Sequence, residues 1–383
     1  MTRAQDRSVL RVAHLRHDAP DAVPRLFDAL GPDEMELVVL FVSPQADFDT
    51  VIAAAARFGA GTRVIGCSTA GEISPEGYTE GEIVAVGFPR DLFRARLHLI
   101  ADLDDIPAQQ IIDRMIQRRH EMAQEHPDWP AEFNFVLIDG LSTREDALTS
   151  DLAMGLGPVP LFGGSAGDGA EFRETFVLHD GKAHRNAAVL AQFRSRCPVR
   201  VFKTDHLVPT ETRMVVTRAD PKRRIVQEIN AEPAAREYAR VLGKDPEGLS
   251  TFTFAAHPLV VRIGEQHHVR AIQRVADTGD LVFFSAIDEG LVLSLAQPRN
   301  MVDHLRGELA SLSAKGAPAN ILGCDCILRR MEAEQKQMSG EISRLMSAAH
   351  VVGFSTYGEQ FNSMHVNQTL TGVAFYPPEE DDR

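Results

Sequence analysis

One pattern occurs three times along the chain and constrains its fold more than any other sequence feature. A nearly continuous apolar run is followed by a helical pattern, a short turn rich in glycine and hydroxyl residues, and a second apolar run. The apolar runs predict buried strands, because a strand covered on both faces shows no polar alternation. Copy 1 begins at Glu36, copy 2 at Phe133 and copy 3 at Asn320.

The three turns align residue by residue, with copy 2 one residue shorter. They read Gly66-Cys67-Ser68-Thr69-Ala70-Gly71-Glu72, Gly163-Gly164-Ser165-Ala166-Gly167-Asp168 and Gly353-Phe354-Ser355-Thr356-Tyr357-Gly358-Glu359. Glycine permits positive φ and close approach of neighbouring backbone, and hydroxyl groups satisfy local N–H groups. Because it recurs, we interpret the turn as an architectural or ligand-lining device rather than a catalytic one.

The alternation of strands and helices predicts an α/β (α+β) fold of two related domains, with mixed sheets flanked by helices. We expect an N-terminal segment (1–30), a first domain (31–230), a second domain (231–378) and a charged tail (379–383). The turns are expected near strand ends, where ligand crevices form in open α/β sheets.

Composition excludes several classes of function. The 383 residues carry a net charge of −14, which argues against sequence-independent nucleic-acid binding and against docking on anionic lipid. No apolar run reaches the length of a membrane span, and the first 23 residues lack the apolar core of a secretion signal. Four scattered cysteines do not form a disulfide framework. These features predict a cytoplasmic protein.

The repeated turn, the "HPLVVR" strand and the stretch "GFSTYGEQFNSMHVNQTLTGVA" resemble the FIST sensory family, over about Leu37 to Phe375. The resemblance implies a FIST N-terminal domain, a FIST C-terminal domain and a non-enzymatic sensor of a small ligand. The length and "GEQFNSMH" are similar to a branch of nitric-oxide-sensing haem proteins (the NosP type). Since no kinase or receptor motif is present, the resemblance implies control of a separate histidine kinase or cyclic-di-GMP enzyme. The sequence leaves homo-oligomer formation open.

The candidate ligand-binding residues lie in and after the three turns. They are Cys67, Ser68, Thr69, Glu72, Ser165, Asp168, Ser355, Thr356, Tyr357, Glu359 and Gln360. Three of them are acids, which would repel a phosphate and would suit a ligand amine. A haem-free sensor of amino acids or other small molecules is therefore an alternative.

The haem version needs a histidine ligand to the iron, and the chain has 14 histidines. His365, beside Met364, and His257 are the candidates. No C-x-x-C-H motif is present, so the haem would be b-type. We expect gas binding to break or move the His–iron bond.

A second alternative is a hydrolase using Ser165 or Cys67, since "GGSAG" fits the nucleophile-elbow pattern. The sequence after this turn does not look helical, and no triad partner is evident, so we expect no enzymatic activity.

Overall fold

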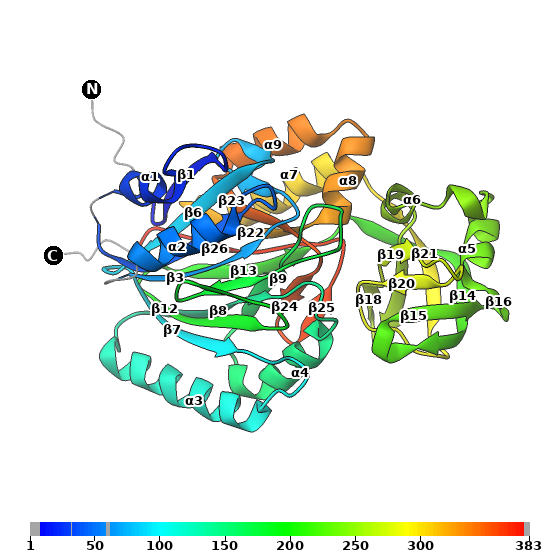
Figure 1. The fold of residues 1–383 in the computed structure, drawn as a ribbon, viewed down its shortest axis with the longest axis horizontal. Helices are drawn as coiled ribbons and strands as arrows, with labels where there is room; N and C mark the ends of the chain where they lie inside the picture. Colours follow the sequence, from blue (N-terminus) through cyan, green and yellow to red (C-terminus); the bar gives the residue numbers. More distant parts are fainter. Residues whose placement is uncertain (1–7, 32, 59–61, 379–383) are drawn as a thin grey trace.

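The computed structural model describes residues 8–31, 33–58 and 62–378, which form a body and a smaller lobe (Figure 1). The body contains all three copies of the repeat. The lobe (207–298) lies between β13 (Val199–Thr204) and α7 (Met301–Leu312). The predicted tail (379–383) and the first seven residues of the predicted N-terminal segment lie outside the described residues.

The body has three six-stranded sheets with the same strand order. The first sheet contains, in spatial order, β1 (Arg11–Arg16), β6 (Glu82–Pro89), β2 (Met35–Val42), β3 (Arg63–Ser68), β10 (Val177–His179) and β11 (Lys182–His184). The second contains β7 (Phe93–Ile100), β12 (Ala188–Ser195), β8 (Ala131–Ile138), β9 (Leu161–Ser165), β24 (Glu359–Phe361) and β25 (Met364–Val366). The third contains β13, β26 (Leu370–Phe375), β22 (Asn320–Cys326), β23 (Val351–Thr356), β4 (Glu72–Ser74) and β5 (Gly77–Thr79).

The last two strands of each sheet form a hairpin donated by another copy. The hairpin β4–β5 of copy 1 pairs with β23 of copy 3, and β24–β25 of copy 3 pairs with β9 of copy 2. The hairpin β10–β11 of copy 2 closes the cycle by pairing with β3 of copy 1. The body therefore has pseudo-threefold symmetry, in which every copy completes its neighbour's sheet.

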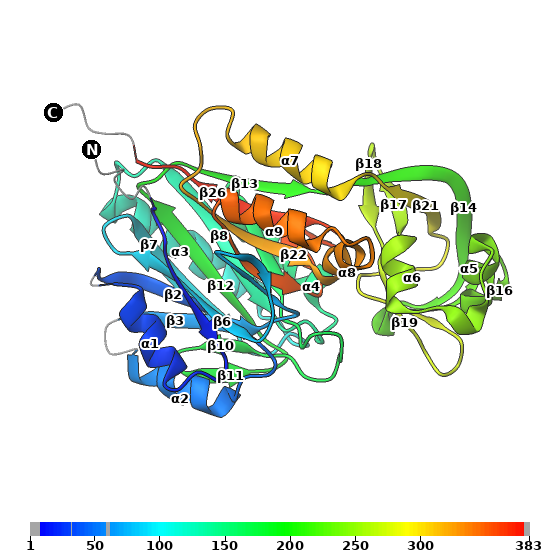
Figure 2. The ribbon, with the colours of Figure 1, turned by 90° about the horizontal axis from the view of Figure 1, so that it is seen from above.

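Each sheet is covered on both faces, as the apolar strands predict. The inner faces pack around one core rich in phenylalanine, which includes Phe41, Phe133 and Phe354. The outer faces are covered by helices that share hydrophobic clusters with the strands. These are α1 (Ala22–Ala29) and α2 (Phe48–Phe58) on the first sheet, α3 (Ala108–Glu125) and α4 (Glu145–Leu156) on the second, and α7, α8 (Ile327–Gln335) and α9 (Ser339–Ala348) on the third (Figure 2). The expected mixed sheets flanked by helices are confirmed.

The lobe has its own sheet and its own core, which includes Tyr238, Phe254 and Phe283. The strands follow the order β18 (Gln266–Val269), β17 (Leu259–Ile263), β21 (Val292–Pro298), β14 (Leu207–Asp220), β15 (Ile225–Ile229), β20 (Leu281–Phe283) and β19 (Ile272–Val275), with β16 (Glu232–Pro233) beside β15. The helical segments are η1 (Pro221–Arg223), α5 (Ala234–Leu242), η2 (Pro246–Gly248) and α6 (Thr251–Ala256). The division of the chain at residue 230 stays a prediction.

Two adjacent chain crossings connect the lobe to the body. Arg299 N donates to His206 O at 2.7 Å, which holds the outgoing and returning segments together. The buried imidazole of His206 also contacts α8, with Nε2 2.9 Å from Glu332 Oε2 and Nδ1 3.0 Å from Arg329 Nη1. The lobe is thus joined to the body by two chain segments that lie side by side. None of the described helices is both long and apolar enough to cross a membrane.

Candidate functional site

The three turns meet inside the body, where β3, β9 and β23 end. Among the backbone hydrogen bonds that join them, three are equivalent, because each comes from the residue two places after the serine of its turn. Ala70 N donates to Ser355 O at 2.9 Å, Gly167 N to Ser68 O at 3.0 Å, and Tyr357 N to Ser165 O at 3.3 Å. Each of these three bonds ends on a different turn, so together they close a ring. The expectation that the turns gather at strand ends is confirmed.

The first glycine of each turn is required by the parallel strand beside it. A Cβ added at Gly66 would overlap the carbonyl oxygen of Leu40, and one added at Gly163 would overlap that of Val136. Gly353 faces the corresponding backbone carbonyl of β22 in the same way. This recurring overlap gives a physical reason for the glycine that begins all three turns.

The hydroxyl groups of the turns mostly bond to nearby protein groups. Ser68 Oγ accepts from Phe176 N at 3.2 Å, and Thr356 Oγ1 accepts from Ser165 N at 3.0 Å. Ser165 Oγ accepts from Gln360 Nε2 at 3.1 Å. These bonds hold the turns and the donated hairpins in register.

Neither predicted nucleophile has a base beside it. Among the described residues, no imidazole bonds to Ser165 or Cys67, and the amide of Gln360 stands between Ser165 and His365. Cys67 is fully buried, and this burial raises the pKa of its thiol well above the ordinary value. An activated nucleophile requires a base within hydrogen-bond reach or a lowered pKa, so the geometry gives the hydrolase alternative no support.

The carboxylate of Asp168 binds the loop that follows it. It accepts from the backbone N–H groups of Phe172 at 2.8 Å, Arg173 at 2.7 Å and Glu174 at 2.8 Å, and from the Tyr357 hydroxyl. Its oxygen atoms are thus occupied within the protein.

Glu72 and Glu359 occupy equivalent places in copies 1 and 3. Glu72 Oε2 accepts from Glu82 N at 3.0 Å, and Glu359 Oε2 accepts from Thr369 N at 3.1 Å. Each carboxylate thereby fastens its turn to the start of the closing strand. Burial raises the pKa of Glu72 to about 7 and that of Glu359 well above its ordinary value.

His365 lies on β25, opposite Gln360 of β24. Gln360 Nε2 is 3.1 Å from His365 Nδ1 and 3.3 Å from the carbonyl oxygen of Gly358, so this end of the amide must be the donor. His365 Nδ1 therefore accepts, and the hydrogen of the neutral ring is on Nε2. Burial lowers the pKa of His365, which favours this neutral form.

The segment 355–368, called the polar segment below, leaves an unusual number of buried polar atoms unpaired. The atoms without a hydrogen-bond partner are Ser355 Oγ, Glu359 Oε1, Gln360 Oε1, His365 Nε2, Asn367 Oδ1 and Gln368 Oε1. Native proteins leave only a few such groups per hundred residues, and each requires an explanation. Gln368 Nε2 donates to Ala255 O of the lobe at 2.9 Å, so the polar segment reaches the interface with the lobe.

A buried ion-pair cluster joins the lobe to α4. Arg224 of the lobe is 4% exposed, and its Nη2 lies 2.8 Å from Glu145 Oε2 and 2.9 Å from Asp146 Oδ2. Asp146 Oδ2 also accepts from Ala286 N of the lobe at 3.0 Å. These contacts bind the lobe to α4, next to the polar segment.

Aromatic contacts connect the central turns to the lobe. The ring centroid of Tyr357 lies 4.7 Å from that of Phe172 and 5.9 Å from that of Phe284 in the lobe. Tyr357 is the only one of the three equivalent turn positions with a large side chain, since copies 1 and 2 have Ala70 and Gly167 there. Copy 3 thus supplies the contact between the ring of turns and the lobe.

The two predicted haem ligands lie on different units. His257 follows α6 in the lobe and is half-buried, and burial lowers its pKa. His365 lies in the body, where the neighbouring Met364 is partly exposed. In the part of the chain that the structure describes, no group of three or more His, Cys, Asp or Glu side chains is arranged to hold a metal ion.

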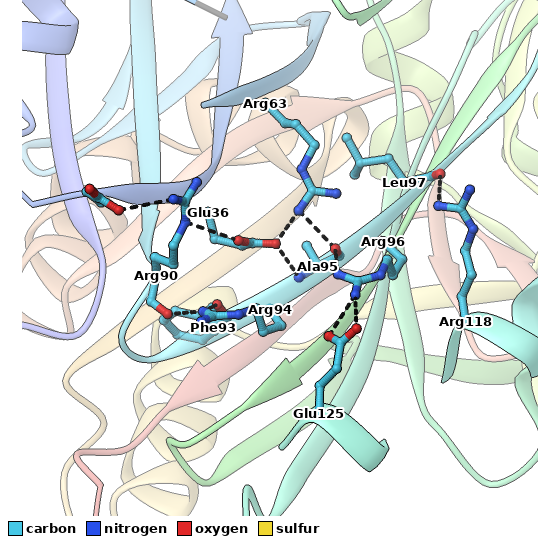
Figure 3. A network of polar contacts seen from close by, with 11 residues as sticks. Glu36, Arg63, Arg90, Phe93, Arg94, Ala95, Arg96, Leu97, Arg118 and Glu125 are labelled. Atoms are coloured by element: carbon cyan, nitrogen blue, oxygen red, sulfur yellow. Dashed lines mark hydrogen bonds and ion pairs between the residues drawn. The ribbon is translucent and has the colours of Figure 1, made fainter. Parts of the chain in front are cut away.

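A separate arginine-rich network lies along the edge strand β7 (Figure 3). Ala95 N donates to Glu36 Oε1 at 3.0 Å, and Ala95 O accepts from Arg63 Nη2 at 2.9 Å. Arg96 Nη2 bonds to both carboxylate oxygens of Glu125 at 2.7 Å. Side chains therefore satisfy edge groups that a further strand would otherwise pair with, and we assign the network to structure.

Residues 36–232 match the FIST N domain and residues 234–362 match the FIST C domain. These domains define a class of ligand-sensing signal-transduction proteins, which is sensory rather than catalytic. The matches cover most of the 383 residues, and the chain belongs to the FIST family. Among curated proteins, none matches the chain.

The residues at the interface between body and lobe are not among the candidates that the sequence suggests. Arg224, Glu145 and Asp146 belong to segments that read as an ordinary turn and a helix start. The unpaired amides of Asn367 and Gln368 were quoted within a motif and given no role. No signal in a single sequence shows that these segments meet, because the contact depends on how the lobe docks.

Proposed function

We propose that the chain is a sensor whose small-molecule ligand binds between the body and the lobe, beside the polar segment. The observation that carries this proposal is the set of unpaired buried polar atoms between Ser355 and Gln368. A buried polar group without a partner costs about 1–3 kcal/mol, which a ligand that supplies the partner would recover. The predicted site residues Ser355, Glu359 and Gln360 belong to this set.

Binding requires the lobe to part from the body, because these atoms have almost no accessible surface in this arrangement. The Arg224 cluster stabilises the closed arrangement. A ligand with higher affinity for the open arrangement shifts the population toward it. In this proposal the newly exposed surfaces regulate a separate histidine kinase or cyclic-di-GMP enzyme.

The test combines a thermal-shift screen with hydrogen exchange. Amino acids and related small molecules are screened first, since a ligand that binds only native protein raises the melting temperature. Exchange with the best ligand should increase in α4 and in residues 284–287 and stay unchanged in the buried strand β2. A ligand that stabilises the chain while leaving exchange at the interface unaltered would contradict the proposed location.

The more specific version is a b-type haem protein that senses nitric oxide, with an iron that would bind the gas. His365 has a positioned ring and an unpaired Nε2, which supports this version. The fit is poor in the closed arrangement, because Nε2 carries the hydrogen and has almost no accessible surface. Haem ligation by His365 therefore requires both a change of tautomer and opening of the hairpin.

The haem version is tested by adding haem to the purified chain and recording visible spectra with and without nitric oxide. A Soret band that shifts in His365→Ala or His257→Ala, while exposed His267→Ala leaves it unchanged, would support the version and identify the ligand. If no Soret band forms, the haem version fails and the haem-free sensor stands.

A further inference from the structure

Arg270 lies where the lobe faces the body, and its guanidinium has no ion pair among the described residues. Its Nη1 donates to Val269 O at 3.1 Å, and its Nε is buried without a partner. Arg224, in the same region, is matched by two carboxylates. A largely desolvated guanidinium without a carboxylate is unfavourable, because burial of a charge requires compensation. Arg270 thus has unused capacity to bind an anion.

Two further unpaired groups lie in the same region of the interface as Arg270. Phe284 N donates to Ala271 O at 2.9 Å, so the antiparallel register places Ser285 opposite Arg270. Ser285 is fully buried, and its hydroxyl has no partner. On the body side, β25 with His365 packs against α4, which binds Arg224 of the lobe, and the Nε2–H of His365 is also unpaired.

All three unpaired groups can donate a hydrogen bond: the Nε–H of Arg270, the hydroxyl of Ser285 and the Nε2–H of His365. A ligand that completes them must present acceptors and, opposite the guanidinium, a negative charge. Two carboxylates, Glu145 and Asp146, lie nearby, and Asp146 acts electrostatically on Arg270. These carboxylates would repel a dianion such as phosphate about twice as strongly as a monoanion, so a ligand with a single negative charge is favoured.

We propose that the ligand of the sensor carries one carboxylate, held by Arg270 and Ser285 of the lobe and by His365 of the body. This inference rests on the proposed function, since it assigns a chemical class to the same interface. The carboxylate enters when the lobe parts from the body, and it then holds the two units at the wider separation that makes room for it.

The test measures binding of simple probes by ligand-observed NMR. The probes are the linear monocarboxylates from acetate to hexanoate, with methylammonium and inorganic phosphate as comparisons at equal ionic strength. We expect a carboxylate to bind the wild-type chain and Arg270→Gln to raise its Kd by about 10- to 100-fold, the value of a charge-assisted hydrogen bond. Arg262→Gln is the matched control, because Arg262 is exposed on β17 and, among the described residues, donates only to Gly264 O.

Ser285→Ala keeps the inference testable if Arg270→Gln does not fold. It removes an unpaired buried hydroxyl, so stability should be unchanged or slightly higher while carboxylate affinity falls several-fold. Absence of carboxylate binding by the wild-type chain, or equal binding by wild type, Arg270→Gln and Ser285→Ala, overturns the inference. If a ligand of another class increases hydrogen exchange in α4, only the carboxylate inference is overturned. If no probe changes exchange at the interface, the proposed function is overturned as well.

Discussion

Replacement of Arg224 by methionine tests how firmly the lobe is held. The change removes the only ion-pair partner recorded for Glu145 and Asp146 within the described residues. Glu145 is 2% exposed, so its carboxylate would stay buried without compensation. Removal of one member of a buried pair costs about 3–5 kcal/mol. Separation of the lobe from the body would let water reach Glu145. The substitution should therefore lower the free energy of lobe docking more than the free energy of unfolding.

Hydrogen exchange measured by mass spectrometry provides the assay. Protection of peptides from residues 145–156 and 284–287 should fall by roughly 100- to 4,000-fold, since each 1.4 kcal/mol is a factor of ten. Protection of β2 and β8 should not change. The amide of Ala286 is the most direct reporter, because it donates to Asp146.

The control variant adds Glu145→Gln and Asp146→Asn to Arg224→Met. Neutral amides tolerate burial far better than unpaired carboxylates, so much of the lost protection should return. The reasoning is refuted if Arg224→Met leaves exchange at the interface unchanged, or if β2 and β8 lose protection to the same extent.

Three further predictions concern the turns. Gly66→Ala should lower the free energy of unfolding by about 2–3 kcal/mol through backbone overlap, whereas the helical control Gly307→Ala, with open space around it, should raise it by up to about 1 kcal/mol. Urea unfolding followed by fluorescence of the single tryptophan, Trp129 of the body, measures both, and equal effects would contradict the overlap. Glu72 has a folded pKa raised to about 7, so its stabilising contribution is present below pH 4.5 and is lost as the pH rises through 7. Glu72→Gln should therefore gain roughly 3 kcal/mol relative to wild type between pH 5 and pH 8 in urea titrations, and a constant difference would refute the raised pKa. Tyr357→Phe removes a hydroxyl that bonds to the copy 2 loop, and should cost about 1–3 kcal/mol and increase exchange in residues 168–174, where unchanged exchange would count against this role.

The repeat could be predicted because each of its elements is specified by residues that lie close together in the sequence. The strands β2, β8 and β22 are long apolar runs, and the glycine of each turn is fixed by the strand directly beside it. The exchange of hairpins was not predictable in this way. The strands β4, β5, β10 and β11 have three residues each, too few to show a period, and their pairing depends on segments far away along the chain.

The same limit applies to the candidate site. The sequence singles out the turns and His365 as candidate site residues, and it suggests that Glu72, Asp168 and Glu359 would suit a ligand amine. The structure gives each of them backbone N–H partners, a role visible only when the closing strand or the following loop is in place. Whether the predicted site residues contact a ligand stays a prediction.

The four apolar runs between residues 257 and 297 predict a meander, in which each strand pairs with the next, and the structure corrects this expectation. The strand β21 pairs with β17 and β14 and does not pair with β20, which precedes it. The apolar patterns of these strands are correct, but alternation does not specify which strand lies beside which.

The cyclic exchange of hairpins has a consequence for how the chain is made. Ile73 of copy 1 pairs with Gly353 of copy 3, so the first sheet hairpin to be synthesised has no partner until almost the whole chain exists. At about 5–20 residues per second, this wait lasts roughly 15–60 s during synthesis. An early-emerging domain ordinarily folds before its successor appears, whereas here the three copies must assemble together. The ring of turns, and any signal that passes through it, exists only as a property of the finished polypeptide.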